Sequence, residues 1–77
     1  MKVKLDDLKE AISLNIKKYR KAKGISQEKL ALISGIDRSY MSEIERCLAN
    51  PSIEALLRIS NALEIGPEDL IKSLRKR

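Results

Sequence analysis

Residues 27–46 read QEKLALISGIDRSYMSEIER, and this stretch decides the fold. It holds two short amphipathic segments separated by Ser34-Gly35-Ile36. Gly35 stands where the chain must leave a helix through a positive φ, a conformation that glycine adopts at little steric cost. Asp37 offers a side-chain oxygen to the first free N–H groups of the next segment, so we expect a helix to start at Arg38. The stretch therefore predicts a helix, a tight turn and a second helix.

The side chains of this stretch predict one buried face and one polar face. Ala31 is small where the second helix must cross the first closely, and the apolar residues that can be buried together are Leu30, Ile36, Met41 and Ile44. The open end of the second helix carries polar groups of the kinds that bind base edges in a major groove, namely Arg38, Ser39, Ser42 and Glu43. The whole pattern is that of a helix-turn-helix.

Upstream of this pair, apolar residues recur every three or four positions from Leu5 to Tyr19, which predicts a helix with one buried stripe. We expect it to start behind Asp6 or Asp7 and to end at Gly24. Ser26 is a partial N-cap signal for the helix over roughly 27–34, because Lys29 occupies the position that Glu or Gln takes in a capping box. The helix that follows the turn should cover 38–46.

Two more helices are predicted downstream. After the loop Ala49-Asn50-Pro51, Ser52 caps a fourth helix with a broad apolar face made of Ile53, Leu56, Leu57, Ile59, Ala62 and Leu63. Gly66-Pro67 should stop that helix and start a fifth, since proline is tolerated in a first helical turn. Leu70, Ile71 and Leu74 complete the fifth helix. The prediction is an all-α fold of five helices in one domain over residues 1–77, with a core from about residue 8 to residue 74.

Composition excludes several classes of function. The chain has 77 residues, no histidine and one cysteine, Cys47. It therefore lacks the usual general base, the usual metal ligand and any pair of cysteines for a disulfide, so we expect no enzyme, no metal and no cofactor. The small core suggests no pocket for a small-molecule ligand. No run approaches membrane-spanning length, and a reducing cytoplasm fits a lone cysteine best.

Positive charge is concentrated beside the helix-turn-helix. The net charge is +5, and five basic residues crowd one seven-residue stretch, namely Lys17, Lys18, Arg20, Lys21 and Lys23. Such a run is often only a solvated face. Next to a helix that docks on DNA, it can instead neutralise phosphates and release counterions, which gives affinity without sequence preference.

Four elements of the chain resemble the Xre-like family of phage-repressor and Cro-type regulators, from about Ile16 to Leu63. They are the IKKYRKAKGISQEKLA run, the Gly35 turn, the RSYMSEIER helix and the NPSIEALLRISNALEI helix. An ordinary helical hairpin would explain the alanine and the glycine, but not all four elements together. Residues 36–46 look particularly like the controller proteins of restriction-modification systems, which are stand-alone proteins that switch their own promoter.

The resemblance implies a compact, repressor-like DNA-binding domain whose second and third helices form the helix-turn-helix. Arg38 is the leading candidate for base recognition, together with Ser39, Ser42 and Glu43, and Glu43 could also orient Arg38. Gln27 is similar to a family glutamine that binds a phosphate and braces the third helix. Tyr40 has an equal alternative as a half-buried packing residue. The candidates for contacts to the DNA backbone are Gln27, Lys29, Tyr40, Arg46, Asn50 and Lys18.

Two positions carry structural implications of the resemblance. Arg20 and Glu45 occupy positions that hold a partly buried ion pair in repressors of this family, so Arg20 is interpreted as structural. Cys47 departs from the family, which commonly has glycine where the third helix ends. A non-glycine residue is strained there if φ is positive, so the exit of that helix could differ from the family. The thiol is interpreted as packed and not reactive.

One copy of such a domain contacts few base pairs, so a homodimer on a palindromic operator is expected. The apolar residues Ile65, Ile71 and Leu74 are the predicted dimer interface, and the competing interpretation folds all three back onto the first helix. Double-stranded DNA is the expected partner, with RNA polymerase as a further candidate. The alternative functions are an antitoxin, a generic Xre-type repressor and, from another class, a protein-only adaptor.

Overall fold

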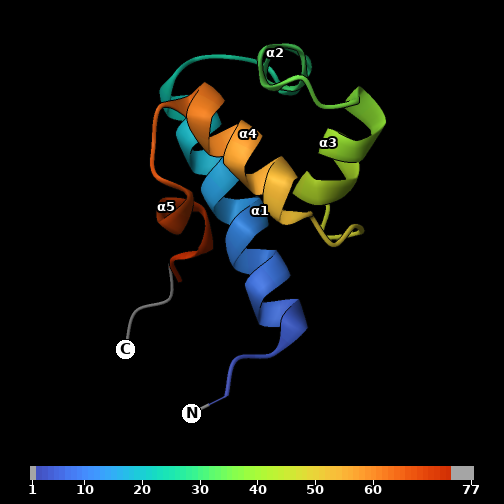
Figure 1. Ribbon diagram of the computed structural model, residues 1–77, viewed down its shortest axis with the longest axis vertical. Helices are drawn as coiled ribbons and strands as arrows, with labels where there is room; N and C mark the ends of the chain where they lie inside the picture. Colours follow the sequence, from blue (N-terminus) through green and yellow to red (C-terminus); the bar gives the residue numbers. More distant parts are fainter. Residues whose placement is uncertain (1, 74–77) are drawn as a thin grey trace.

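The structure is a computed structural model that describes residues 2–73. Within that range the chain forms five α-helices and no strand: α1 (Leu5–Ala22), α2 (Gln27–Ser34), α3 (Arg38–Glu45), α4 (Ile53–Leu63) and α5 (Pro67–Ile71). In the view of Figure 1 the long α1 lies between α5 on one side and α3 on the other. The predicted all-α fold with its five helices is therefore confirmed.

The first helix begins at Leu5, earlier than the sequence predicted. An extended Lys4 precedes it without a side-chain cap, and Asp6 and Asp7 lie inside the first turn. The two carboxylates are favourable there because the N-terminal end of a helix carries partial positive charge. Their role is therefore that of first-turn residues and not of N-caps. At the other end the helix stops at Ala22, and Gly24 follows with a φ of 70°.

The helix-turn-helix forms through the caps that the sequence indicated. The Ser26 hydroxyl accepts a hydrogen bond of 3.0 Å from the backbone N–H of Lys29. Gly35 adopts a φ of 70° between the two helices. Asp37 Oδ2 then accepts from the N–H groups of the second and third residues that follow it, at 2.9 and 3.4 Å. These local bonds fix where α2 ends and where α3 begins.

The exit of α3 keeps a left-handed residue although that residue is not glycine. The helix ends at Glu45, one residue earlier than predicted, and Cys47 follows at a φ of 63°. For an L-residue with a Cβ this conformation costs about 1–2 kcal/mol. The N–H groups of Cys47 and Leu48 donate to the carbonyls of Ile44 and Glu43 at 3.2 and 2.8 Å. Cys47 Sγ lies 3.8 Å from the Lys9 carbonyl of α1, so the half-buried thiol packs between two helices.

The end of α4 differs from the prediction. Glu64 terminates the helix with a φ of 61°, two residues before the Gly66-Pro67 pair that was expected to stop it. The N–H groups of Glu64 and Ile65 donate to carbonyls of the last helical turn at 3.1 and 3.0 Å. Pro67 then starts α5, as predicted. The last predicted residue of this helix, Leu74, lies outside the described residues.

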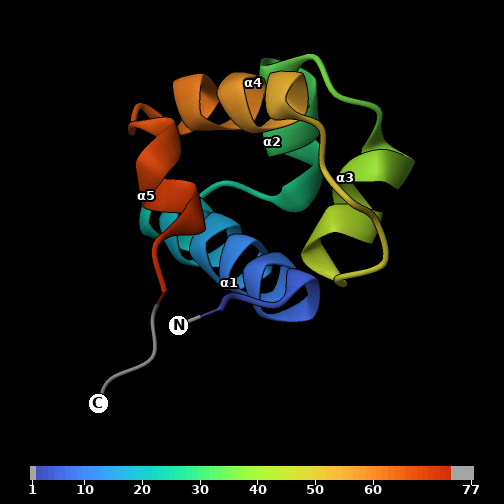
Figure 2. The same cartoon turned by 60° about the horizontal axis from the view of Figure 1, so that its bottom comes forward.

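Aliphatic side chains from all five helices form one core around α1. α1 contacts α3, α4 and α5, while α2 packs on α3 and α4. Figure 2 shows α4 on the opposite side of the molecule from α1. The core buries Leu30, Met41 and Ile44 together, as expected. The small Ala31 of α2 is buried with them. The remaining buried members of the core are Ile12, Ile16, Ile59, Leu63 and Leu70.

The predicted apolar face of α4 is only partly buried. Ile59 and Leu63 belong to the core and Leu56 packs against it. Ile53 and Leu57 do not, because they remain 87% and 49% exposed. Their spacing of four residues places both on one face of the helix. The prediction was wrong for these two side chains, which leave an apolar strip on the surface.

Candidate nucleic-acid interface

α3 turns one side to the core and presents the other at the surface. Met41, Ile44 and Glu45 are buried beneath it. The four residues predicted to contact bases lie on its outer side, where Arg38, Ser39 and Glu43 are exposed and Ser42 is half-buried. A helix of this diameter fits a DNA major groove about 12 Å wide. The polar side of α3 can therefore approach base edges without moving the core.

An ion pair ties α3 to α1. The Arg20 guanidinium donates to both carboxylate oxygens of Glu45, at 2.9 and 3.1 Å, as the family resemblance implied. The side chains are only 14% and 3% exposed, so neither charge is well hydrated. A third donor of Arg20 bonds the Ile25 carbonyl at 3.1 Å, and the Gln27 amide donates to Glu45 at 3.2 Å. Gln27 thus braces α3 from the start of α2, and its backbone contact to DNA stays a prediction.

Arg38 has an acidic neighbour that the sequence did not single out. Its guanidinium lies 3.8 Å from the Glu28 carboxylate of α2, and both side chains are about 70% exposed. Glu43, for which orienting Arg38 was one alternative beside a base contact, makes no ion pair within residues 2–73. In the free protein the acidic neighbour of Arg38 is Glu28. An exposed pair of this length contributes little to stability, but it biases where the guanidinium points.

Hydrogen bonds join Arg46, which follows the end of α3, to Ser42 on that helix. Arg46 Nε donates to the Ser42 hydroxyl at 3.2 Å and lies 3.4 Å from the Ser42 carbonyl. The two residues that the sequence assigned to different DNA contacts are thus joined in the free protein. Because the Ser42 hydroxyl accepts this bond, its own hydrogen can still be donated to a base edge.

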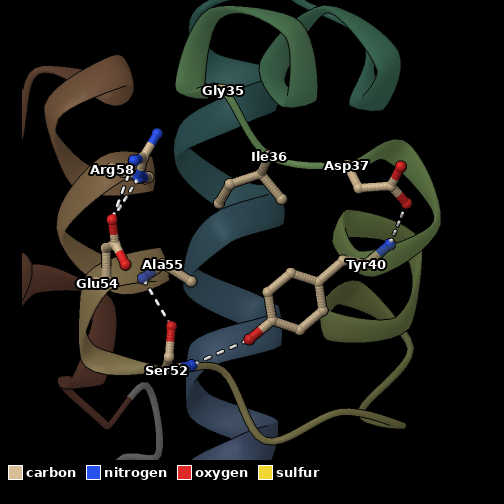
Figure 3. A pocket seen from close by; sticks show the side chains of 8 residues that line it. All are labelled: Gly35, Ile36, Asp37, Tyr40, Ser52, Glu54, Ala55 and Arg58. Atoms are coloured by element: carbon tan, nitrogen blue, oxygen red, sulfur yellow. Dashed lines mark hydrogen bonds and ion pairs between the residues drawn. The ribbon is translucent and has the colours of Figure 1, made fainter.

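Tyr40 connects α3 to the start of α4. Its hydroxyl accepts from the Ser52 N–H at 3.0 Å and lies 3.5 Å from the Asn50 carbonyl. A shallow hollow of about 260 Å³ lies beside this ring. Figure 3 shows Tyr40 on one side of the hollow and Glu54 and Arg58 on the other. Because Arg58 pairs with Glu54 and the Ser52 hydroxyl caps α4, these polar groups already have partners. The phenol fixes the loop that holds Asn50, which favours its packing role.

The lysines named as backbone contacts are exposed. Lys29 lies in the first turn of α2, and the Lys18 ammonium sits 5.2 Å from the centre of the Tyr19 ring on α1. Lys23 is engaged differently, because it donates to Glu64 at 2.7 Å. That hydrogen bond and the positive charge of Lys23 lower the pKa of the Glu64 carboxyl below its usual value. One member of the basic run therefore pairs with an acid that directly follows α4.

The predicted dimer residues divide into three cases. Ile65 is half-buried and packs against the core. Ile71 remains 46% exposed on α5, and Leu74 lies outside the described residues. The sequence missed Ile53 and Leu57 as further exposed apolar residues, because it assigned them to the buried face.

Two buried polar residues of α1 were also missed. Ser13 donates to the Glu45 carbonyl at 2.6 Å, and Asn15 donates to the carbonyls of Leu70 and Lys72 at 2.8 and 2.7 Å. Both interrupt the apolar stripe beside Ile12 and Ile16. A polar residue on a predicted core face is the signal that would have identified them.

Within residues 2–73, no three side chains of the metal-binding types gather into a metal site. Over the same part of the chain, no helix combines the length and apolar character needed to cross a membrane.

Comparison with known proteins defines the class. Residues 16–70 match the family model described as helix-turn-helix. The N-terminal DNA-binding domain of SinR from Bacillus subtilis superposes with a TM-score of 0.81 at 40% identity, over 87% of this chain and 99% of that one. Full-length SinR is longer, and the chain spans 55% of it. The chain therefore belongs to the helix-turn-helix family of transcriptional regulators, in its Xre branch.

More particular similarities are to restriction-modification controller proteins. Control protein C.SmaI of Serratia marcescens is 35% identical over 65 residues, which are 84% of this chain and 77% of that protein. The controller protein C.AhdI from Aeromonas hydrophila has a TM-score of 0.77 at 40% identity, over 80% of this chain and 94% of that one. The predicted likeness to controller proteins is thereby confirmed. These relatives are regulators and not enzymes, which agrees with the prediction of a non-enzyme.

Proposed function

We propose that the chain is a sequence-specific regulator of transcription that binds a palindromic operator in double-stranded DNA as a homodimer. The observation that carries the proposal is the placement of Arg38. It lies exposed in the first turn of α3, while the Arg20–Glu45 ion pair anchors the far end of the same helix. A rigidly held helix with an exposed guanidinium at its open end is suited to the major groove.

The contacts divide by chemistry. Arg38 donates two hydrogen bonds to guanine O6 and N7, a pairing worth roughly 1–3 kcal/mol of discrimination. Ser39, Ser42 and Glu43 contact neighbouring base edges. Affinity without sequence preference comes from phosphate contacts of Gln27, Lys29, Tyr40, Arg46, Asn50 and Lys18.

Self-association uses the exposed apolar side chains of α4 and α5. The exposed candidates for this pairing surface are Ile53 and Leu57 of α4 and Ile71 of α5. Leu74, outside the described residues, is a further candidate from the sequence. Burial of such side chains between two copies removes apolar area from water, at about 25 cal/mol per Å². A two-fold arrangement then gives two copies of α3, whose half-sites lie about one helical turn apart.

The similarity to C.SmaI and C.AhdI supports a controller-type autoregulator acting in the cytoplasm, with RNA polymerase as a further partner. A generic Xre repressor or an antitoxin would use the same DNA surface, whereas a protein-only adaptor would not bind duplex DNA.

Selection of bound sites from random duplex DNA tests the proposal. We expect enrichment of a palindrome with a guanine at matching positions of both halves, bound by two chains per duplex in sedimentation analysis. Affinity should fall steeply over a salt series, because counterions are released from phosphates. Failure to enrich any sequence, or absence of duplex binding at low salt, would refute the proposal and favour the adaptor.

A further inference from the structure

α1 carries two fully buried polar side chains, and they serve opposite sides of the molecule. Ser13 and Asn15 are 2% and 1% exposed. Residues two apart on a helix point about 200° away from each other. Ser13 accordingly bonds the end of α3, whereas Asn15 bonds the end of α5. Since buried polar groups are costly unless they are bonded, each side chain requires its own neighbour in place.

The bonds of Asn15 compensate for a weakness of α5. This helix is only five residues long, and an extended Lys72 ends it. The last carbonyls of a helix have no partner within the helix. One amide nitrogen of Asn15 donates to the carbonyls of both Leu70 and Lys72, at 2.8 and 2.7 Å. Asn15 therefore supplies from α1 the partners that α5 cannot provide for itself.

The two carbonyls flank Ile71. Leu70 is fully buried, whereas Ile71 is 46% exposed. When the carbonyls on both sides of a residue are held by one rigid donor, the backbone around that residue is fixed, and so is the direction of its side chain. Asn15 thus determines where the apolar side chain of Ile71 stands on the surface.

We propose that Asn15 is a positioning residue for self-association: its amide holds the α5 backbone so that Ile71 meets a second copy of this chain. Ser13 has the matching task on the other side of α1, where it holds the end of α3 for DNA. This inference rests on the proposed dimer and adds a residue that does not itself touch the partner. On this account, the hydrogen bonds of Asn15 support pairing, and the hydrogen bond of Ser13, on the same helix, supports DNA contact.

The test compares Asn15→Leu with Ser13→Ala in the full chain. Asn15→Leu removes both amide hydrogens at similar volume, and Ser13→Ala removes the matched donor two residues away. Sedimentation equilibrium gives the dimer dissociation constant, and binding to a duplex with a single half-site gives the DNA affinity of one copy. Hydrogen exchange reports the local order of residues 68–72.

For Asn15→Leu we expect dimerisation at least tenfold weaker, faster exchange at residues 68–72 and half-site affinity within twofold of the parent. Ser13→Ala should show the reverse, with weaker half-site binding and dimerisation close to the parent. Should Asn15→Leu not fold, Asn15→Ser is judged by the same readouts. If Asn15→Leu dimerises like the parent, the role of Asn15 is wrong while the proposed dimer stands. Equal losses of dimerisation and of half-site binding would also overturn the role of Asn15, because they indicate general destabilisation. A parent chain that is monomeric in solution and on a palindrome would overturn the proposed dimer, and this inference with it.

Discussion

The recognition half of the molecule, α2 and α3, and the pairing half, α4 and α5, are stabilised in different ways. In the recognition half, polar contacts within one chain complete the structure, chiefly the Arg20–Glu45 ion pair, Gln27 and Ser13. In the pairing half, Ile53, Leu57 and Ile71 remain exposed. The recognition half is therefore tied to α1 by polar bonds within one chain, although α2 also exposes Leu32, whereas the exposed apolar side chains of α4 and α5 are those proposed to be covered in a dimer. Under the proposed function, this difference separates the residues that contact DNA from the residues that assemble the dimer.

The largest effect should come from Arg20→Met, which attacks the recognition half. It leaves the Glu45 carboxylate, 3% exposed, without its cation. Removing one partner of a buried pair costs about 3–5 kcal/mol. Thermal or urea unfolding measures the loss, and Lys18→Met, which removes an exposed charge from the same helix, is the control. Equal unfolding curves for the two variants would mean that the ion pair does not fix α3.

A charge introduced into the pairing half should weaken dimerisation and leave the fold intact. Leu57→Glu on α4 and Ile71→Glu on α5 place carboxylates among the exposed apolar side chains proposed for pairing, and each should weaken dimerisation by about 2 kcal/mol or more, roughly thirtyfold. Sedimentation equilibrium measures the change, and circular dichroism verifies the fold. Leu32→Glu, on the exposed side of α2, is the matched control and should leave dimerisation unaltered. If it is the only variant that produces monomers, the interface lies on α2.

A smaller effect should come from the exit of α3. Cys47 adopts a φ of 63°, which is easier for glycine than for a residue with a Cβ. The free energy of unfolding of Cys47→Gly should therefore be about 1 kcal/mol higher than that of Cys47→Ala, which keeps the Cβ but loses the thiol. Denaturant unfolding measures both variants. Identical stabilities would show that the left-handed strain at this exit is negligible.

The sequence predicted the features whose chemistry is local. Ser26, Gly35 and Asp37 act on backbone groups within a few residues, so the bounds of α2 and the start of α3 followed from them. The end of α4 shows the limit of such rules. Glycine is favoured in a left-handed exit, yet Glu64 takes that conformation while Ile65 packs against the core. Tertiary packing overrides the local preference there.

The contacts that could not be predicted join distant residues. Asn15 bonds carbonyls more than fifty residues away, and backbone carbonyls leave no mark in a sequence. The Glu28–Arg38 pair depends on the crossing of α2 over α3, which no spacing rule gives. Ile53 and Leu57 were misplaced because periodicity identifies apolar side chains without distinguishing a core from an interface. The Arg20–Glu45 pair was anticipated from the family resemblance, not from spacing.

Base discrimination by Arg38→Ala tests the central claim most directly. Binding is measured on the selected palindrome, on the same duplex with the symmetric guanines replaced, and on unrelated duplex. The parent should discriminate against the replaced guanines, and Arg38→Ala should lose this preference, worth roughly 1–3 kcal/mol in each half-site, while it binds unrelated duplex almost as before. Lys29→Ala, the phosphate-contact control, should weaken all three duplexes alike and lower the salt slope by about one unit. If Arg38→Ala instead weakens all three equally, Arg38 is a phosphate ligand and the assignment of base recognition to it is wrong.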